Sequence, residues 1–389
     1  MDMDIHELAK KHEEYLIRMR RHFHMYPELS LQEEKTSRRI REELEKMGIP
    51  YEVVGHRNIV GKMEFSRPGK RLAIRADIDA LPMNEEIESE FKSTVPGVMH
   101  ACGHDVHAAC LLAAAKCFSE MKDELSGTVY LCFQVAEEIS GGGPEEIIEY
   151  LDSIGGVDEV IANHMTPLID PWMAAALAGP TNAGNCQWRI TVRGRGGHGS
   201  RPDLSIDPIR PAAKILDAVT QIPSNYHDPF NPLVVSPCMI HSGTAYNIIP
   251  DECYMEGNIR YFHLEELDEV LAQMEKIATA IAGAFGASAE VKKIAGCPPV
   301  ENDPAVTEKV KRIMKEMGVT VVTPPTANMG SDDFGYFTAK YPGCYFNFGA
   351  SSKRPDASHS LHNTKLFYDE DGFIPITEFF VRYAEDLLK

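Results

Sequence analysis

The sequence predicts an α/β protein with a central mixed sheet flanked by helices, interrupted by a smaller inserted α+β domain. Predicted strands alternate with predicted helices over residues 51–164, which is the pattern of a sheet covered by helices. Near Gly179 this pattern gives way to longer strands paired with two amphipathic helices. At 389 residues the chain also exceeds what one hydrophobic core usually serves, so two domains are expected.

The first domain begins with helices. Apolar residues repeat at helical spacing before Pro27, and a second amphipathic stretch covers residues 31–47. Asp105 is the expected N-cap of a later apolar helix. The further expected elements are strands over 51–54, 59–65, 71–77, 127–135 and 157–162, a helix over 105–121, and a helix opened by the glycine-rich turn at 141–144.

The insertion is expected over residues 183–294, between the two parts of the larger domain at 1–182 and 295–389. Its length of roughly a hundred residues is within the usual range for one domain. Its expected elements are strands over 186–194, 233–240, 251–262 and 291–293 and helices over 207–222 and 264–285, after which helices over 303–317 and 370–388 return to the first domain.

Composition narrows the class of protein. Hydrophobic content of 43% and charged content of 25% are those of an ordinary soluble globular protein. The net charge of −19 argues against nucleic acid or an anionic membrane as a partner. No stretch approaches the length of a membrane span, and the N-terminus is acidic rather than a basic signal sequence. Nine cysteines without a CxxC pair favour free thiols in the cytoplasm.

The densest group of metal-binding side chains lies at residues 100–107, just before the predicted helix. It contains His100, Cys102, His104 and His107. Thiolate and imidazole bind borderline transition metals tightly. A polar loop with surface histidines would explain any one of these residues, but the cluster favours a metal site.

Further candidates follow predicted strands directly. Asp77 and Asp79 follow the strand at 71–77, Glu137 and Glu138 the strand at 127–135, and His164 the strand at 157–162. Ligands gather at the carboxyl ends of strands in open α/β sheets, so these side chains are expected in one crevice. A late polar segment adds His359 and His362. Asp77 and Asp79 could be metal ligands themselves or acceptors that orient a ligand imidazole. The second role is favoured for Asp79.

Glu137 and Glu138 form a pair with two expected tasks. Neighbouring residues on extended backbone point to opposite sides. One carboxylate is therefore expected to bind metal while the other faces the substrate as a base, the division that a hydrolytic metal site needs.

Residues 194–199 match the GxGxxG pattern but do not predict a dinucleotide site. The pattern requires a helix immediately afterwards, and Arg201 and Pro202 follow instead. A glycine-rich turn that presents His198 is the better interpretation.

These motifs resemble, over nearly the whole chain, the metal-dependent amidohydrolase branch of the aminoacylase/carboxypeptidase superfamily. That branch includes hippurate hydrolases, N-acetyl-amino-acid and N-acetyldiaminopimelate deacetylases, and auxin-conjugate hydrolases. The resemblance depends on several motifs in the same order: residues 21–30, 75–82, 100–107, 134–138, 196–202, 247–250 and 359–363.

The resemblance implies a di-metal catalytic domain with an inserted lid domain that often pairs two subunits, giving a homodimer or homotetramer. It implies two divalent ions, manganese or zinc first and cobalt or nickel next. Cys102 would bridge them, and this thiolate, in place of a carboxylate, identifies the branch. The roles implied for the other residues are metal ligands for His104, Glu138, His164 and His362, general base for Glu137, oxyanion stabilisation for His198, substrate binding for Asn247 and Arg260, and support of a ligand for Asp79.

The expected reaction is hydrolysis of the amide bond of N-acyl amino acids of the acetyl or benzoyl type. One alternative is a dipeptidase or carboxypeptidase on the same scaffold. The other is a metal-binding or thiol-sensing protein without turnover, in which Glu137 would have no task.

Overall fold

The computed structural model describes residues 4–139 and 142–389. The chain forms two compact units, which are described separately. The first comprises Met1–Thr181, Glu301–Ala327 and Tyr336–Lys389, and the second Asn182–Val300 and Asn328–Gly335. The second unit therefore extends beyond the expected insertion at 183–294 and includes a short segment from the later part of the chain.

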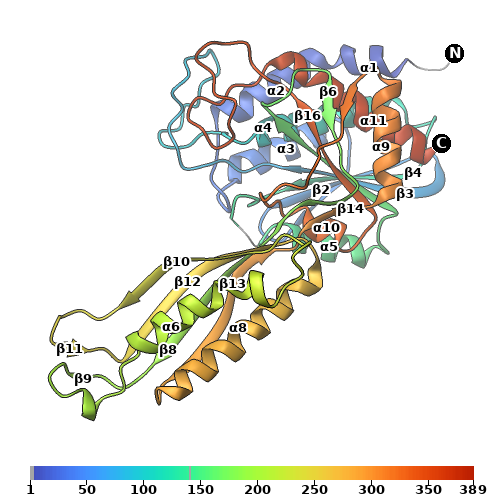
Figure 1. Ribbon diagram of the computed structural model, residues 1–389. Coiled ribbons are helices and arrows are strands. Elements are labelled where there is room, and N and C mark those ends of the chain that lie inside the picture. The colour runs from blue at the N-terminus through green and yellow to red at the C-terminus, as the bar shows by residue number, and fades with distance from the viewer. Residues whose placement is uncertain (1–3, 140–141) are drawn as a thin grey trace. The chain divides into compact units, whose positions relative to one another are not determined.

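The first unit is built on a mixed eight-stranded sheet (Figure 1). Its central strands β4, β3, β5 and β16 are parallel, whereas β1, β2 and β4 pair antiparallel. The predicted mixed sheet is thereby confirmed. In spatial order the strands are β1 (Tyr51–Val54), β2 (Asn58–Glu64), β4 (Ser126–Gln134), β3 (Arg67–Asp77), β5 (Glu159–Thr166), β16 (Gly343–Gly349), β6 (Met173–Ala175) and β15 (Thr320–Val322).

Helices pack around this sheet. Helix α4 (His104–Glu120) is buried over most of its length, where it packs against α2, α11 and β3. Helix α3 packs on β2, α5 on β1, β2 and β4, and α9 on β15 and β16. The remaining bounds are α1 (Ile5–Lys11), α2 (Glu13–Met25), α3 (Glu34–Lys46), α5 (Pro144–Ser153), α9 (Pro304–Glu316), α10 (Gly335–Thr338), η2 (Glu370–Gly372) and α11 (Ile374–Leu388).

The second unit is an antiparallel sheet with helices packed against it, as predicted. Trp188, fully buried, belongs to its separate core. The sheet order is β10 (Val234–Ser242), β12 (Glu252–Tyr261), β8 (Gly184–Arg193) and β13 (Ser288–Cys297), with helices α6 (Ile209–Val219), α7 (Ile222–Asn225) and α8 (Leu264–Ala284). A two-stranded ribbon, β9 (Gly197–His198) and β11 (Ile248–Ile249), follows β8, and η1 covers Pro202–Leu204. Strands β7 (Gly179–Asn182) and β14 (Val300–Asn302) carry the chain across the boundaries of this unit.

Three local expectations need correction or limitation. Helix α4 begins at His104 after Gly103, so Asp105 is not its N-cap; its carboxylate instead accepts from His24 and forms an ion pair with Arg20. Strand β5 continues to Thr166, so His164 lies within the strand rather than after it. Gly141 of the expected glycine-rich turn lies outside the described residues, and α5 begins at Pro144.

Candidate metal centre

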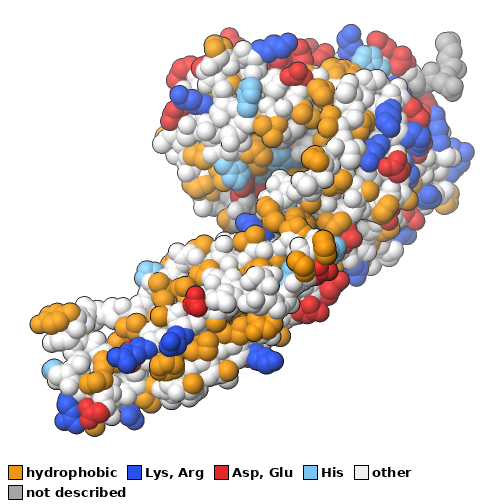
Figure 2. Space-filling view, viewed as in Figure 1, with side chains coloured by type: hydrophobic (Ala, Val, Ile, Leu, Met, Phe, Trp, Pro, Cys, Tyr) orange, Lys and Arg blue, Asp and Glu red, His pale blue; other side chains and the backbone are white. Residues whose placement is uncertain are grey.

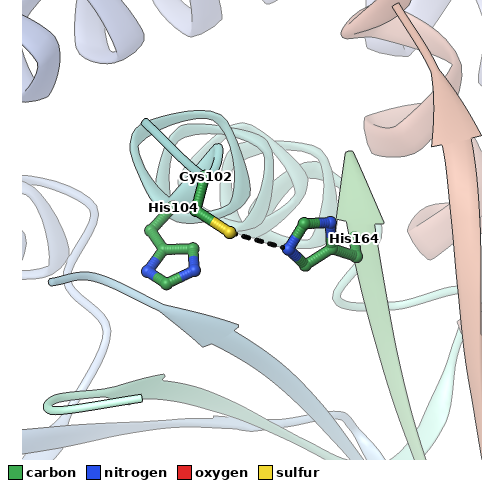
Figure 3. A group of neighbouring side chains, drawn as sticks. All are labelled: Cys102, His104 and His164. Carbon is green, nitrogen blue, oxygen red and sulfur yellow. Dashed lines mark hydrogen bonds between the residues drawn. The ribbon is translucent and has the colours of Figure 1, made fainter. Parts of the chain in front are cut away.

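Three expected ligands meet where α4 begins beside β5. Cys102 and His104 lie at the start of α4, and His164 projects from β5 toward them (Figure 3). The sulfur of Cys102 lies 3.2 Å from Nε2 of His164, and the ligating atoms of all three residues lie within 4.8 Å of one another. All three side chains are buried.

Hydrogen bonds orient both imidazoles toward this point. Nδ1 of His164 donates to the carbonyl oxygen of Met165 at 2.6 Å. Nδ1 of His104 donates to Asp79, 3.0 Å from its carbonyl oxygen and 3.1 Å from Oδ1. Since Nδ1 carries the proton of each neutral ring, Nε2 keeps the lone pair that a metal ion binds. A carboxylate behind a histidine is the usual support of a ligand imidazole.

Asp79 also holds the loop that carries the two glutamates. Its Oδ2 accepts from the backbone N–H of Glu138 at 3.0 Å and from Ser30 Oγ at 2.7 Å. Burial raises the pKa of Asp79, but the hydrogen bond and charge of His104 outweigh it, and the pKa is lowered overall. Asp79 therefore remains an anion and links one ligand candidate to another.

Asp77 and His107 lie with His104 in a further group whose ligand atoms are within 4.8 Å of one another, but Asp77 and His107 already bond to each other and to neighbouring groups. His107 donates from Nδ1 to Asp77 Oδ1 at 2.5 Å, and its Nε2 accepts from the backbone N–H of Met165 at 2.9 Å. Asp77 Oδ2 accepts from Arg75 at 2.6 Å. The pair thus supports the Met165 peptide beside His164, and the ligand role left open for Asp77 is not favoured.

Glu138 and His362 form a second group with Cys102. Nε2 of His362 lies 3.4 Å from Oε2 of Glu138, and the two share a 4.8 Å group with the Cys102 sulfur. His362, at φ 54°, donates its backbone N–H to Ala101 at 2.7 Å. Cys102 is therefore common to both groups, the position from which a thiolate could contact two ions. His359 does not take part, since its Nε2 donates to the carbonyl oxygen of Ser352.

The expectation that Glu137 and Glu138 point to opposite sides is wrong. Strand β4 ends at Gln134, Ala136 has φ 61°, and both glutamates lie in a turn rather than on extended backbone. Each places one carboxylate oxygen 3.9 Å from Nε2 of His104. The two acids therefore face the same cluster.

Two observations indicate that the residues of these two groups could hold a metal ion. Among the described residues, the buried atoms His104 Nε2 and Glu138 Oε1 have no hydrogen-bond partner, although such atoms normally have one. Tetrahedral bonds of about 2.0–2.3 Å place ligand atoms roughly 3.3–3.7 Å apart. The separations here, 3.2 Å, 3.4 Å and 3.9 Å, bracket that range.

Protonation opposes metal binding and makes it depend on pH. Burial raises the pKa of the Cys102 thiol. Burial lowers the pKa of His104, but the charge of Asp77 and then of Cys102 outweighs it, so the pKa is raised well above its usual value. A bound ion must therefore displace protons from both side chains, and binding should strengthen as the pH rises.

A second buried network, made of hydrogen bonds and an ion pair, includes Asp105 at the start of α4. His24 lies between Asp105, 2.7 Å from Nδ1, and Glu85, 3.2 Å from Nε2. Arg20 lies 3.0 Å from the same Asp105 carboxylate. His100 is buried beside this network, and burial lowers its pKa to about 4, so it is neutral at physiological pH.

The candidates of the second unit lie in two separate places, at the two-stranded ribbon and on the four-stranded sheet. His198 and Asn247 are close together, since β9 pairs with β11 and Gly199 donates to the Asn247 carbonyl. His198 is exposed, and its Nδ1 accepts from the Ser200 backbone N–H at 3.1 Å, so Nε2 carries the proton of the neutral ring. Arg260 lies at the far end of β12, where it donates to Ser331 at 2.9 Å.

Sequence reasoning missed Tyr368 and strand β16. The hydroxyl of buried Tyr368 donates to the Cys102 carbonyl, a contact between residues far apart in the sequence that no local motif marks. Strand β16, which pairs with the strand carrying His164, was detectable as a short run rich in aromatic residues between Gly343 and Gly349.

Known proteins are similar to this chain over most of its length. The model of peptidase family M20/M25/M40 matches residues 73–386. The chain is 40% identical over 363 residues to thermostable carboxypeptidase 1 of Saccharolobus solfataricus, covering 92% of each chain. It is 40% identical over 289 residues to the N-acyl-L-amino acid amidohydrolase of Geobacillus stearothermophilus, covering 74% of this chain and 78% of that protein.

The fold also matches a solved structure. The Bacillus subtilis YXEP protein, described as a dinuclear metal-binding peptidase of family M20, superimposes with a TM-score of 0.83 at 31% identity, covering 97% of this chain and 98% of that one. Within the described part of this chain, no helix has the length and apolar character needed to cross a membrane.

Proposed function

Because this chain belongs to peptidase family M20/M25/M40, we propose that it hydrolyses the amide bond of N-acyl amino acids to a carboxylate and a free amino acid. Similar proteins in this family are amidohydrolases and deacetylases, which indicates that this chain is a metal-dependent hydrolase of amides. The observation that carries the finer proposal is Cys102 at the point common to both ligand groups, with a second carboxylate, Glu137, beside the ligand His104.

The proposed ligands are Cys102, His104, Glu138, His164 and His362. One thiolate, three imidazoles and one carboxylate suit two divalent ions, manganese or zinc first and cobalt or nickel next. When bound, such ions polarise an amide carbonyl and lower the pKa of a water molecule toward neutrality.

Glu137 is the proposed general base. Its carboxylate faces the ligand cluster, 3.9 Å from His104 Nε2, whereas the Glu138 carboxylate also lies beside His362. Glu137 would accept the proton of the attacking water and return it to the leaving amine. A positioned proton acceptor of this kind contributes typically about 10²–10⁴ in rate.

His198 is proposed to stabilise the oxyanion, since the proton on its Nε2 is available for donation. Asn247 and Arg260 are proposed to bind the substrate. Arg260 lies eight positions beyond Glu252 on β12, which is about 26 Å at ~3.3 Å per residue, and His198 lies beyond the Glu252 end. One small N-acyl amino acid cannot span that distance. If both residues act on one substrate, they therefore come from different subunits.

Two features of the second unit support a homodimer, or a homotetramer built from it. Strand β10 is an edge of its sheet, and Met239 and Ile240 on it are exposed (45% and 47%). Apolar side chains are also exposed elsewhere along this unit, as Figure 2 shows. An edge strand with exposed apolar residues is a ready surface for pairing with another copy. The cytoplasm is the proposed location, because all nine cysteines are free thiols.

A carboxypeptidase or dipeptidase is the second candidate, because the carboxypeptidase relative is as similar as the amidohydrolase relative. The test is a panel of acetyl- and benzoyl-amino acids beside dipeptides, each assayed with manganese, zinc, cobalt and nickel. We expect the acyl-amino acids to give the higher kcat/KM. Higher values for dipeptides would establish the second candidate, and metal binding without any turnover would favour a metal- or thiol-sensing protein.

A further inference from the structure

The proposed metal ligands come from four segments of the first unit: Glu138 follows β4, and three further segments carry the other ligands. Residues 102–104 open α4, His164 belongs to β5, and His362 precedes the last helix. Ligand atoms from such distant segments keep binding distances only if the backbones that carry them are held together. Tyr368 lies in the same segment as His362, and its side chain contacts the segments that carry Cys102 and His164.

Tyr368 is 2% exposed and follows His362 in the same segment. Its hydroxyl lies 2.6 Å from the carbonyl oxygen of Cys102 and 3.3 Å from that of Met165. The Met165 carbonyl also accepts from Nδ1 of the ligand His164. The hydroxyl and the ligand imidazole therefore share one acceptor.

Gly103 permits this close approach. A Cβ at this position would lie 3.2 Å from Cε2 and 3.3 Å from the hydroxyl oxygen of Tyr368, tighter than ordinary contact. Gly103 also has φ 127°, a backbone conformation that L residues rarely adopt. The aromatic ring thus packs directly against the peptide between Cys102 and His104.

We propose that Tyr368 is a positioning residue, which holds the Cys102 and His164 segments at the separation that binds metal. The inference rests on the proposed metal site. Carbonyl oxygens only accept, so the Tyr368 hydroxyl is the donor in these contacts. Loss of a group that orients metal ligands typically costs about 10- to 100-fold in metal affinity.

The test titrates metal-free protein with Co²⁺ and records the absorption of the thiolate–cobalt bond. Tyr368→Phe should bind Co²⁺ about 10- to 100-fold more weakly and show an altered thiolate band. Tyr383→Phe is the matched control, because Tyr383 is equally buried but its hydroxyl bonds to Glu159 on the opposite end of β5. A merely structural role would lower the thermal midpoint of both variants without changing the spectrum.

Metal release to a chelator gives a second measurement on protein kept loaded with Zn²⁺ throughout, so it does not require the metal-free variant to fold. Tyr368→Phe should release Zn²⁺ at least about tenfold faster than Tyr383→Phe. Wild-type affinity, spectrum and release rate in Tyr368→Phe would overturn the inference.

The Cys102→Ser variant shows whether a negative result concerns the role of Tyr368 alone or the proposed metal site as a whole. If Cys102→Ser loses the thiolate band while Tyr368→Phe keeps it unchanged, only the role of Tyr368 is wrong. If the wild-type protein has no thiolate band and Cys102→Ser binds Co²⁺ equally well, the proposed metal site is wrong and the inference fails with it.

Discussion

The candidate residues of the two units differ in how firmly they are held. In the first unit His104 is buried, and Asp79 accepts from its Nδ1 while also holding the Glu138 loop. In the second unit His198 is exposed, and its ring contacts only its near neighbour Ser200 among the described residues. The proposed metal ligands are thus held by contacts within one unit. The proposed role of His198 would instead require another subunit or domain movement to bring it to a substrate.

Removing metal from the first unit should have the largest effect of any change. Cys102→Ala takes a ligand atom from both groups, so both ions should be lost or bound weakly. Because metal stabilises the transition state by several kcal/mol, hydrolysis should fall by about a thousandfold or more. Metal content and hydrolysis rate check this, and Cys110→Ala, which changes a buried cysteine within α4, is the control. Full metal content and full activity in Cys102→Ala would show that Cys102 is not a metal ligand.

His198→Ala should differ from Cys102→Ala in metal content. It should keep its full complement of metal while turnover is impaired. Loss of one oxyanion donor costs about 10²–10³ in rate. If the residue acts across subunits, mixing inactive His198→Ala with inactive Glu137→Gln should restore part of the activity. No recovery despite demonstrated subunit exchange would place its action within one chain, and undiminished turnover would remove the role.

Asp79→Asn should weaken metal binding without removing a ligand. The amide keeps the shape but loses the charge that holds His104 and the Glu138 loop, so affinity should fall about 10- to 100-fold. Asp158→Asn is the control, because Asp158 accepts from the Arg71 backbone away from the cluster. Equal affinity in the two variants, measured by competition with a chelator, would mean that the Asp79 contacts do not tune the site.

The last expected effect is on stability rather than on activity, and it concerns pH and the buried Glu33. Burial raises its pKa to about 7 from an ordinary 4.5, while its Oε1 accepts from the backbone of Ala136. Between these values the unfolded chain releases a proton that the folded protein keeps, so the stability of metal-free protein should fall as the pH rises. Glu33→Gln should remove about 3 kcal/mol of this pH dependence, measured by urea unfolding at pH 4, 6 and 8.

Glu43→Gln is the control of opposite sign. Burial opposes ionisation of Glu43, but hydrogen bonds from Lys46 and Tyr15 outweigh it and lower its pKa. Its contribution to stability is therefore present above the ordinary pKa and is lost as the pH falls. Glu33→Gln with an unchanged pH dependence would show that Glu33 is ionised in the folded protein.

The sequence allowed prediction of the fold class and of the proposed ligands. Polar residues at predicted strand ends converge because parallel strands present their carboxyl ends at one edge, so Asp79 and Glu138 could be placed near Cys102. The direction of Glu137 could not be predicted, since it depends on the left-handed backbone at Ala136. Tyr368 was missed because its contacts join residues distant in sequence. His198 and Arg260 were named by resemblance, and only the strand register shows that they lie far apart.

The central claim is that two adjacent carboxylates facing one cluster divide metal binding from proton transfer. Metal content and hydrolysis rate measured side by side on Glu137→Gln and Glu138→Gln test it most directly. We predict that Glu138→Gln loses metal and, for that reason, activity. Glu137→Gln should keep wild-type metal while turnover falls by about 10²–10⁴. Normal turnover by fully loaded Glu137→Gln, or metal loss from it equal to that of Glu138→Gln, would contradict the division.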